Sequence, residues 1–260
     1  MIVARFSGSE SLALGVWIGL LRSIVIYHNP VRTVPLRRFY RDLLRKGDLV
    51  FDVGAHVGTR ARAMRAAGAR VVALEPQAPF TGFLRLTLPR DIRLVAAAAG
   101  GAETMAEMAV SSLHPTVSSL KAGFVEDASA THGFGHVRWD RKQRVQVTTL
   151  DRLIAEEGMP RYIKIDVEGF ELEVLSGLTQ PVEMVSVEYL PGLPGLTHEV
   201  IDRLMELGSY QFNPVKGESG AFLWPQWRDA ADTRAWLDSL PATAGSGDLY
   251  ARLAGPDTPA

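Results

Sequence analysis

Cysteine is absent from this chain of 260 residues, so disulfide frameworks, thiolate metal sites and cysteine nucleophiles are excluded. An excess of charge of one sign is also lacking, because 28 Lys and Arg residues stand against 29 Asp and Glu residues. No global field would therefore attract nucleic acid or an anionic membrane. We expect a small-molecule acceptor or ligand, no nucleic-acid partner, and a cytoplasmic location, with which the missing cysteines are compatible.

The sequence also lacks an unbroken apolar run of the roughly 20 residues that span a bilayer. Its most hydrophobic stretch, Leu12 to Ile26, is interrupted by Arg22, and no small-residue cleavage site follows it. We expect a mostly buried helix there, packed on the domain or on a second copy, which makes it a candidate homodimer contact. Membrane association is disfavoured, because this segment has few lysines and arginines for a polar face.

After Gly47, short apolar runs alternate with helical stretches, a pattern typical of a doubly wound, mostly parallel α/β sheet. We predict an N-terminal helical extension over residues 1–46, a main domain over 47–255 and a loose tail over 256–260. Within the domain, residues 100–148 form a long insertion, which we interpret as a lid. The predicted strands are Leu49–Val53, Val71–Leu74, Arg93–Ala97, Tyr162–Ile165, Met184–Glu188, Tyr210–Asn213 and Ala221–Trp224.

The stretch FDVGAHVGT, residues 51–59, follows the first of these strands with a glycine turn. Gly54 and Gly58 permit close backbone approach, and the helix that starts near Thr59 presents free N–H groups. The spacing differs from the G-x-G-x-x-G of nicotinamide enzymes. Asp52 would repel a diphosphate but attract an ammonium or sulfonium group, which favours S-adenosylmethionine. Glu75 lies about 20 residues further on, where such folds place a carboxylate on ribose hydroxyls.

Four segments in this order resemble the FkbM family of S-adenosylmethionine-dependent methyltransferases: GDLVFDVGAHVGT, ALEPQ, TTLDRLI and YIKIDVEGFELEVLSG. The resemblance covers about Leu43 to Leu190. It implies a seven-stranded, Rossmann-like class I methyltransferase fold and O-methylation of a hydroxyl group on a sugar or a polyketide-type metabolite. By this likeness Asp52, Gly54 and Gly58 are donor-loop residues, Glu75 is the ribose acid, and Asp166 belongs to the block after the fourth strand. We also assign cofactor binding to Ala55, His56 and Pro76, with a solvent-facing side chain as the alternative for His56.

The block YIKIDVEGFE also supplies candidates for catalysis, because Lys164 and Asp166 share one face of a strand near its carboxyl end. With Glu168, they can hold the donor, accept the acceptor's proton or bind a divalent cation. We assign Asp166, Glu168 and Lys164 as catalytic residues, with an internal Lys164–Asp166 ion pair as the alternative for the lysine. No metal site is assigned, since the histidine spacing of zinc sites is absent.

The roles of several other residues have more than one interpretation. His114, His132 and His136 in the insertion are candidate lid bases, and Glu188 either reaches the acceptor or ends an exposed strand. Packing is favoured over a pocket role for Trp224 and Trp227. Two other functions stay as alternatives: a nicotinamide-dependent oxidoreductase, which the glycine spacing disfavours, and a non-catalytic donor-binding module.

Overall fold

The computed structural model describes residues 19–27, 29–111, 141–217 and 219–255. Residues 19–27 are helical and include the end of the predicted apolar helix. His114, His132 and His136 lie outside the described residues, as do the start of that helix and the predicted tail. Among the described residues, no helix has both the length and the hydropathy of a membrane span.

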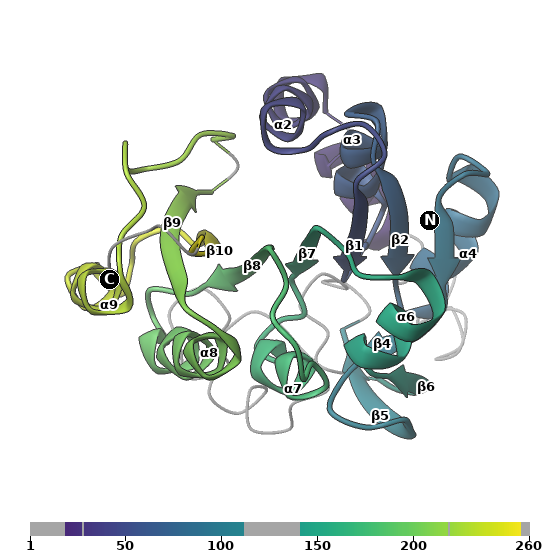
Figure 1. The fold of residues 1–260 in the computed structure, drawn as a ribbon. Coiled ribbons are helices and arrows are strands. Elements are labelled where there is room, and N and C mark those ends of the chain that lie inside the picture. Colours follow the sequence, from purple (N-terminus) through teal and green to yellow (C-terminus); the bar gives the residue numbers. More distant parts are fainter. Residues whose placement is uncertain (1–18, 28, 112–140, 218, 256–260) are drawn as a thin grey trace, which may run out of the picture.

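A seven-stranded, mostly parallel sheet forms the centre of the fold, as the sequence predicted (Figure 1). Its strands are β1 Leu49–Val53, β2 Arg70–Leu74, β3 Arg93–Val95, β7 Tyr162–Ile165, β8 Met184–Tyr189, β9 Tyr210–Lys216 and β10 Gly247–Leu253. They lie in the order β3-β2-β1-β7-β8-β10-β9. The first five are parallel, whereas β10 runs antiparallel between β8 and β9.

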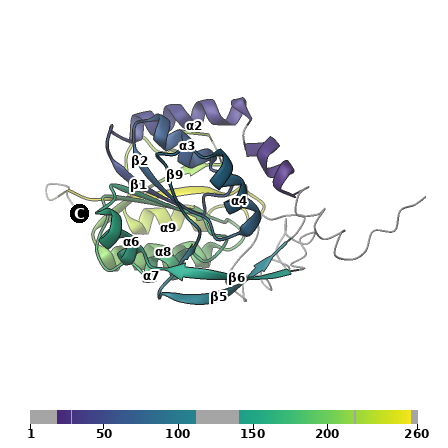
Figure 2. The same cartoon turned by 90° about the vertical axis from the view of Figure 1, so that its right-hand side faces the viewer.

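Helices cover both faces of this sheet, and Figure 2 shows the layers from the side. One face packs against α2 Pro30–Leu43, α3 Thr59–Ala66 and α4 Ala78–Thr87. The other packs against α6 Leu150–Glu157, α7 Glu171–Ser176, α8 Pro194–Leu207 and α9 Ala230–Asp238. Because side chains alternate along a strand, Val50 and Phe51 of β1 enter opposite cores. Every residue of β1 is buried, which explains why four of its five residues are apolar.

A second, three-stranded sheet lies beside the main layers and consists of β4 Ala98–Ala99, β5 Thr104–Val110 and β6 Arg141–Thr148. β5 and β6 fall in the predicted insertion, and Figure 2 shows them below the main sheet. The side chain of Gln143 ties this sheet to the main domain, since it donates to the carbonyl of Pro76 (2.9 Å) and accepts from the amide of Ala78 (3.2 Å).

One strand prediction is wrong. Residues 221–224 form no strand; instead the side chain of Asn213 bonds both the amide and the carbonyl of Trp224, at 3.0 and 2.9 Å. The seventh strand is β10, which is not among the predicted strands. The strand predicted over Arg93–Ala97 is also shorter, because the chain leaves β3 after Val95 to enter β4.

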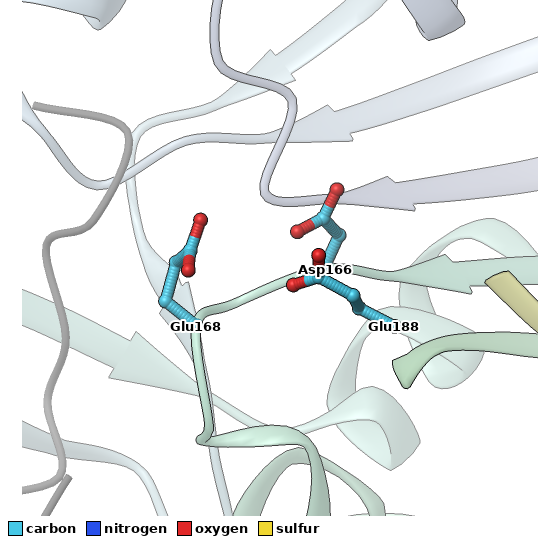
Figure 3. Close-up of side chains that lie close together, drawn as sticks. All are labelled: Asp166, Glu168 and Glu188. Atoms are coloured by element: carbon cyan, nitrogen blue, oxygen red, sulfur yellow. The ribbon is translucent and has the colours of Figure 1, made fainter. Parts of the chain in front are cut away.

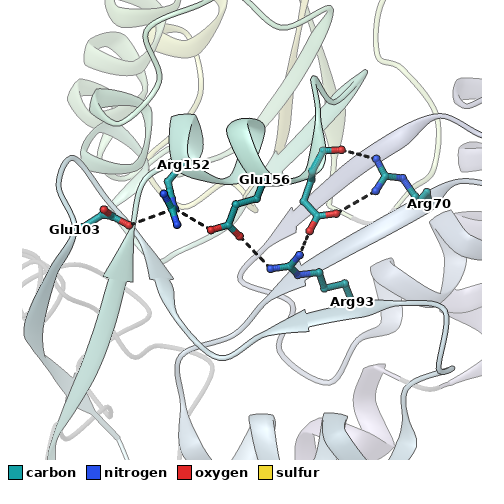
Figure 4. A network of polar contacts seen from close by, with 6 residues as sticks. Arg70, Arg93, Glu103, Arg152 and Glu156 are labelled. Carbon is teal, nitrogen blue, oxygen red and sulfur yellow. Dashed lines mark hydrogen bonds and ion pairs between the residues drawn. The ribbon is translucent and has the colours of Figure 1, made fainter.

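An ion-pair network joins α6 to the amino ends of β2 and β3, at the edge of the sheet opposite the carboxyl ends of the strands (Figure 4). Arg93 pairs with Glu156 at 3.0 Å and also with Glu157, which in turn pairs with Arg70 at 3.0 Å. Glu156 also accepts from Arg152 at 2.8 Å. This network therefore stabilises the end of the domain at which the strands begin. It does not involve the end at which the strands finish.

Candidate active site

The glycine turn after β1 brings two backbone segments into contact at the carboxyl edge of the sheet. Gly54 has φ +84°, and a Cβ there would stand 1.9 Å from the carbonyl oxygen of Asp166, in the turn after β7. Gly58 has φ +76° and caps α3. Both values are in the left-handed region that glycine tolerates best. The sequence prediction of a tight, closely approached turn is therefore confirmed.

Asp52 is the penultimate residue of β1, and its side chain is fully buried. Among the described residues, neither carboxylate oxygen makes a hydrogen bond of normal geometry, although the Ala61 amide lies near enough to lower the pKa. Burial is the largest effect and raises the pKa of Asp52, while Lys164 lowers it. A buried carboxylate without a hydrogen bond is costly, unless a ligand supplies the missing donor. Asp52 lines the cavity in which such a donor would bind.

Glu75 follows β2 and holds the glycine turn in place. One of its carboxylate oxygens accepts from the amide of His56 and the other from the amide of Gln77, both at 2.8 Å. Burial raises the pKa of Glu75 to about 7, although these two hydrogen bonds lower it. Each carboxylate oxygen has a further lone pair, so Glu75 can also accept from ribose hydroxyls.

His56 has φ +51°, a left-handed value that is uncommon for a residue with a side chain. Its ring meets Phe80 edge-on at 4.3 Å between centroids and Tyr27 at 4.9 Å. These contacts place the imidazole at the cavity wall, which Ala55 and Pro76 also line. Strain of this kind clusters at ligand sites.

Lys164 occupies the centre of the site, with only 2% of its side chain exposed. Its Nζ donates to a carboxylate oxygen of Asp166 at 2.7 Å, so the ion pair that the sequence left as an alternative is present. Burial alone would lower the pKa of Lys164, but Asp166 and Asp52 outweigh it and raise that pKa. The lysine is therefore a protonated counter-ion, and its charge keeps the pKa of Asp166 low.

Three carboxylates converge where β7 and β8 end, as Figure 3 shows. Asp166, Glu168 and Glu188 each offer an oxygen, and these oxygens lie within 4.8 Å of one another. Burial, followed by repulsion from neighbouring carboxylates, raises the pKa of both Glu168 and Glu188 well above the ordinary value. Glu188 thus faces the cavity. The trio has the oxygen chemistry of a divalent-cation site, or of a carboxyl group that takes up a proton.

The turn between β7 and α7 fixes the direction of Glu168. Its backbone has φ +55°, and Gly169 follows at +85°. One oxygen of Glu171 accepts from the amides of Val167 and Gly169, both at 3.2 Å, and so closes this turn. Burial raises the pKa of Glu171 to about 7. Glu171 thus holds the loop that carries Glu168.

The surrounding cavity has a volume of about 570 Å³, within the range of small-molecule sites. It also includes a pair that the sequence analysis missed. Arg60, at the start of α3, pairs with Asp248 of β10 at 2.9 Å, and both side chains are largely buried. These residues are far apart in the chain, and only the insertion of β10 beside β8 brings them together. Trp224 and Trp227 do not line this cavity; they stack on Arg228 and Arg252 instead.

Residues 52–239 match the family model described as the methyltransferase FkbM domain, which covers most of the sheet and all of the loops just described. The doubly wound sheet and the cavity at the carboxyl ends of its strands lie largely within this match, which makes this a methyltransferase domain. The chain belongs to the FkbM family of methyltransferases, as its motifs indicated.

A curated relative is the hexuronic acid methyltransferase AglP of Haloferax volcanii, which is 34% identical over 151 residues. This alignment covers 56% of the present chain and 57% of the relative, so the chain matches little more than half of that protein's length.

Solved structures resemble the chain more distantly. A TehB-like methyltransferase from Corynebacterium glutamicum is 8% identical with a TM-score of 0.47, over 90% of this chain and 94% of that one. The magnesium protoporphyrin IX methyltransferase of Synechocystis, with bound S-adenosylmethionine, is 10% identical with a TM-score of 0.43, over 90% and 84%. The fold class rests on the strand order rather than on these matches.

S-adenosylmethionine is the cofactor of this chain. The cavity fits it on two counts. The buried carboxylate of Asp52 can receive a cationic donor group, and Glu75 can accept from the ribose. The chemistry of the cavity thus agrees with a cationic cofactor that has no phosphate.

Proposed function

We propose that the protein transfers a methyl group to a hydroxyl oxygen of a small molecule, of the sugar or polyketide type. The observation that carries this proposal is the carboxylate trio at the cavity wall, in which Glu168 has a raised pKa. A carboxylate with a raised pKa binds a proton more strongly than an ordinary carboxylate does, which suits a general base for a hydroxyl proton.

The charge of the wall favours a hydroxyl over a carboxylate as the group that accepts the methyl. An acceptor carboxylate would meet the ionised Asp166 and be repelled, whereas a hydroxyl can donate a hydrogen bond to one of the three carboxyl groups. We therefore expect a methyl ether as the product, not a methyl ester.

S-adenosylmethionine supplies a methyl carbon already activated by its sulfonium, so the protein must orient the acceptor and remove its proton. We assign proton removal to Glu168. Asp166, held by Lys164 at 2.7 Å, remains ionised and accepts a hydrogen bond from the acceptor or from the donor's ammonium group. Lys164 takes no proton itself, because its neighbours raise its pKa.

The hexuronic acid named for the relative AglP makes sugar acids the first acceptors to test. Purified protein would be incubated with methyl-labelled S-adenosylmethionine and a panel of neutral hexosides, hexuronic acids and polyketide alcohols. The labelled product would then be treated with mild alkali, which cleaves an ester but leaves an ether intact. We expect alkali-stable label on a sugar.

Glu168→Gln should abolish most of this labelling while leaving the affinity for S-adenosylhomocysteine unchanged. The matched control is Glu199→Gln, an exposed glutamate of α8, which should behave as the unmodified protein. Alkali-labile label would overturn the assignment to a hydroxyl. Full activity of Glu168→Gln would show that Glu168 is not the base that removes the proton.

The non-catalytic donor-binding module makes a different prediction in the same assay. It would bind S-adenosylhomocysteine but label no acceptor in the panel or in a metabolite extract. The oxidoreductase alternative has lost its support, because the family is one of methyltransferases.

A further inference from the structure

The outer face of α2 has a composition that the fold does not require. The helix buries Leu36, Phe39 and Tyr40 against the sheet. On its opposite side, Val31 is 78% exposed and Val34 is 63% exposed. The water-facing side of a surface helix normally bears charged or polar residues, and valine has a lower helix propensity than most of them. Neither core packing nor helix formation accounts for these two valines.

The same face of α2 is basic towards its carboxyl end, where Arg37, Arg38 and Arg41 are exposed. At about 100° per residue, these arginines and the two valines fall within an arc of about 120°. Among the described residues, no carboxylate forms an ion pair with any of the three arginines. Asp42 is the single acidic residue in the sequence of α2. We call this face, Val31, Val34, Arg37, Arg38 and Arg41, the outer α2 face.

The preceding helix, residues 19–27, has the same combination of residues. Leu21 and Val25 are 60% and 74% exposed, and Arg22 between them is also exposed. Charge is segregated along the sequence as well, since residues 1–46 contain eight of the 28 basic residues but only two of the 29 acidic ones. The near-zero net charge of the chain therefore conceals a basic N-terminal region.

We propose that the outer α2 face docks on an anionic lipid surface. Valine side chains can enter the boundary between headgroups and acyl chains, and arginines beside them bind lipid phosphates. Membrane association was disfavoured above because the net charge of the chain is near zero and because the segment Leu12 to Ile26 has few basic residues. The basic residues that this segment lacks are supplied by α2.

Two other occupants fit less well. In a two-fold dimer, the same face of each copy meets the other, which would place arginine against arginine. Nucleic acid would satisfy the arginines but would leave Val31 and Val34 unused, because its contacts to such surfaces are mainly with phosphates.

The two helices that bear the exposed valines and arginines also contribute residues to the wall of the cavity. Leu36, on the inner side of α2, and Tyr27, at the end of the preceding helix, both line the cavity. A chain docked through α2 would hold its acceptor site close to the lipid surface.

The test is flotation of the full chain with vesicles of phosphatidylcholine alone and with vesicles that contain phosphatidylglycerol. We expect partition onto the anionic vesicles, and its loss in high salt. Replacement of Arg37, Arg38 and Arg41 by Gln should lower the partition coefficient on the order of a hundredfold, since each arginine contributes about fivefold. Val31→Ser with Val34→Ser should lower it as well.

The matched control replaces three exposed arginines elsewhere, Arg90, Arg141 and Arg144, by Gln and so has the same net charge as the first variant. Thermal unfolding would confirm that each variant folds. Light scattering would show whether the chain is a dimer, and titration with an oligonucleotide would measure its affinity for nucleic acid. Equal partition of the two triple variants would overturn the proposal. So would absence of partition, a dimer that the valine changes dissociate, or tighter binding to the oligonucleotide than to the vesicles.

Discussion

The Arg60–Asp248 pair allows a quantitative test of how the cavity is held together. The two side chains are 18% and 5% exposed and 2.9 Å apart, so Asp248→Ala would leave a guanidinium in a largely desolvated place without its partner. Removing one partner of a buried pair costs about 3–5 kcal/mol. For a domain of this size, that corresponds to a fall in Tm on the order of 10 °C.

The reverse change should cost less. Arg60→Met leaves Asp248, and a carboxylate can take up a proton whereas a guanidinium cannot lose one. We therefore expect Arg60→Met to be milder than Asp248→Ala, and to become milder still at pH 5. The double variant should be more stable than the sum of the two single effects predicts, because it leaves no unpaired charge.

The assay is urea unfolding at pH 5 and pH 8 for both single variants and the double variant. Asp91→Ala is the control, since Asp91 contacts Arg65 at 2.7 Å but both side chains are exposed. That pair should contribute nothing measurable. If Asp248→Ala destabilises no more than Asp91→Ala, or if the two single effects simply add, the pair does not stabilise the cavity wall and the reasoning fails.

Three further outcomes follow from the site. Glu168→Gln should lower kcat by about 10²- to 10⁴-fold, and kcat of the unmodified enzyme should rise with pH as Glu168 ionises; a flat profile would contradict its role as base. Gly54→Ala should eliminate calorimetric binding of S-adenosylhomocysteine, because the new Cβ would lie 1.9 Å from the Asp166 carbonyl; retained affinity would mean that the turn can move. Between pH 5 and 8 the free energy of unfolding should fall by a few kcal/mol, because burial raises the pKa of Glu75 and Glu171 from an ordinary 4.5 to about 7, so the folded state binds more protons; denaturant titrations showing a rise would refute this.

The parts of the fold that the sequence predicted best are those with short-range causes. β1 and β7 have the predicted bounds, because runs such as LVFDV and YIKI must be buried on both sides. α6 also begins at a residue with a local cause, since Thr149 caps it by accepting from the amide of Arg152 at 3.1 Å. In these segments the residues themselves determine both the structure and its limits.

What could not be predicted depends on strands that meet only in the folded chain. Asp248 gave no local signal, because its role arises from a register that sets it beside Glu188 and within reach of Arg60. The segment 221–224 has an apolar pattern but forms no strand; it follows the outer edge of β9 only loosely, where the amide of Leu223 donates to the carbonyl of Pro214 at 2.8 Å. Similarly, the ionised Lys164 could be recognised as a counter-ion only once its distance from Asp166 was known.

The insertion of β10 between β8 and β9 also affects how the chain reaches its native state. β9 is synthesised first, but among the described strands its neighbour in the sheet is β10, so the edge of β8 stays open until the later strand arrives. A β10 from another molecule has the same sequence and fits the same gap. At high concentration, two refolding chains can therefore exchange this strand, and each would complete the other's cavity with its own Asp248.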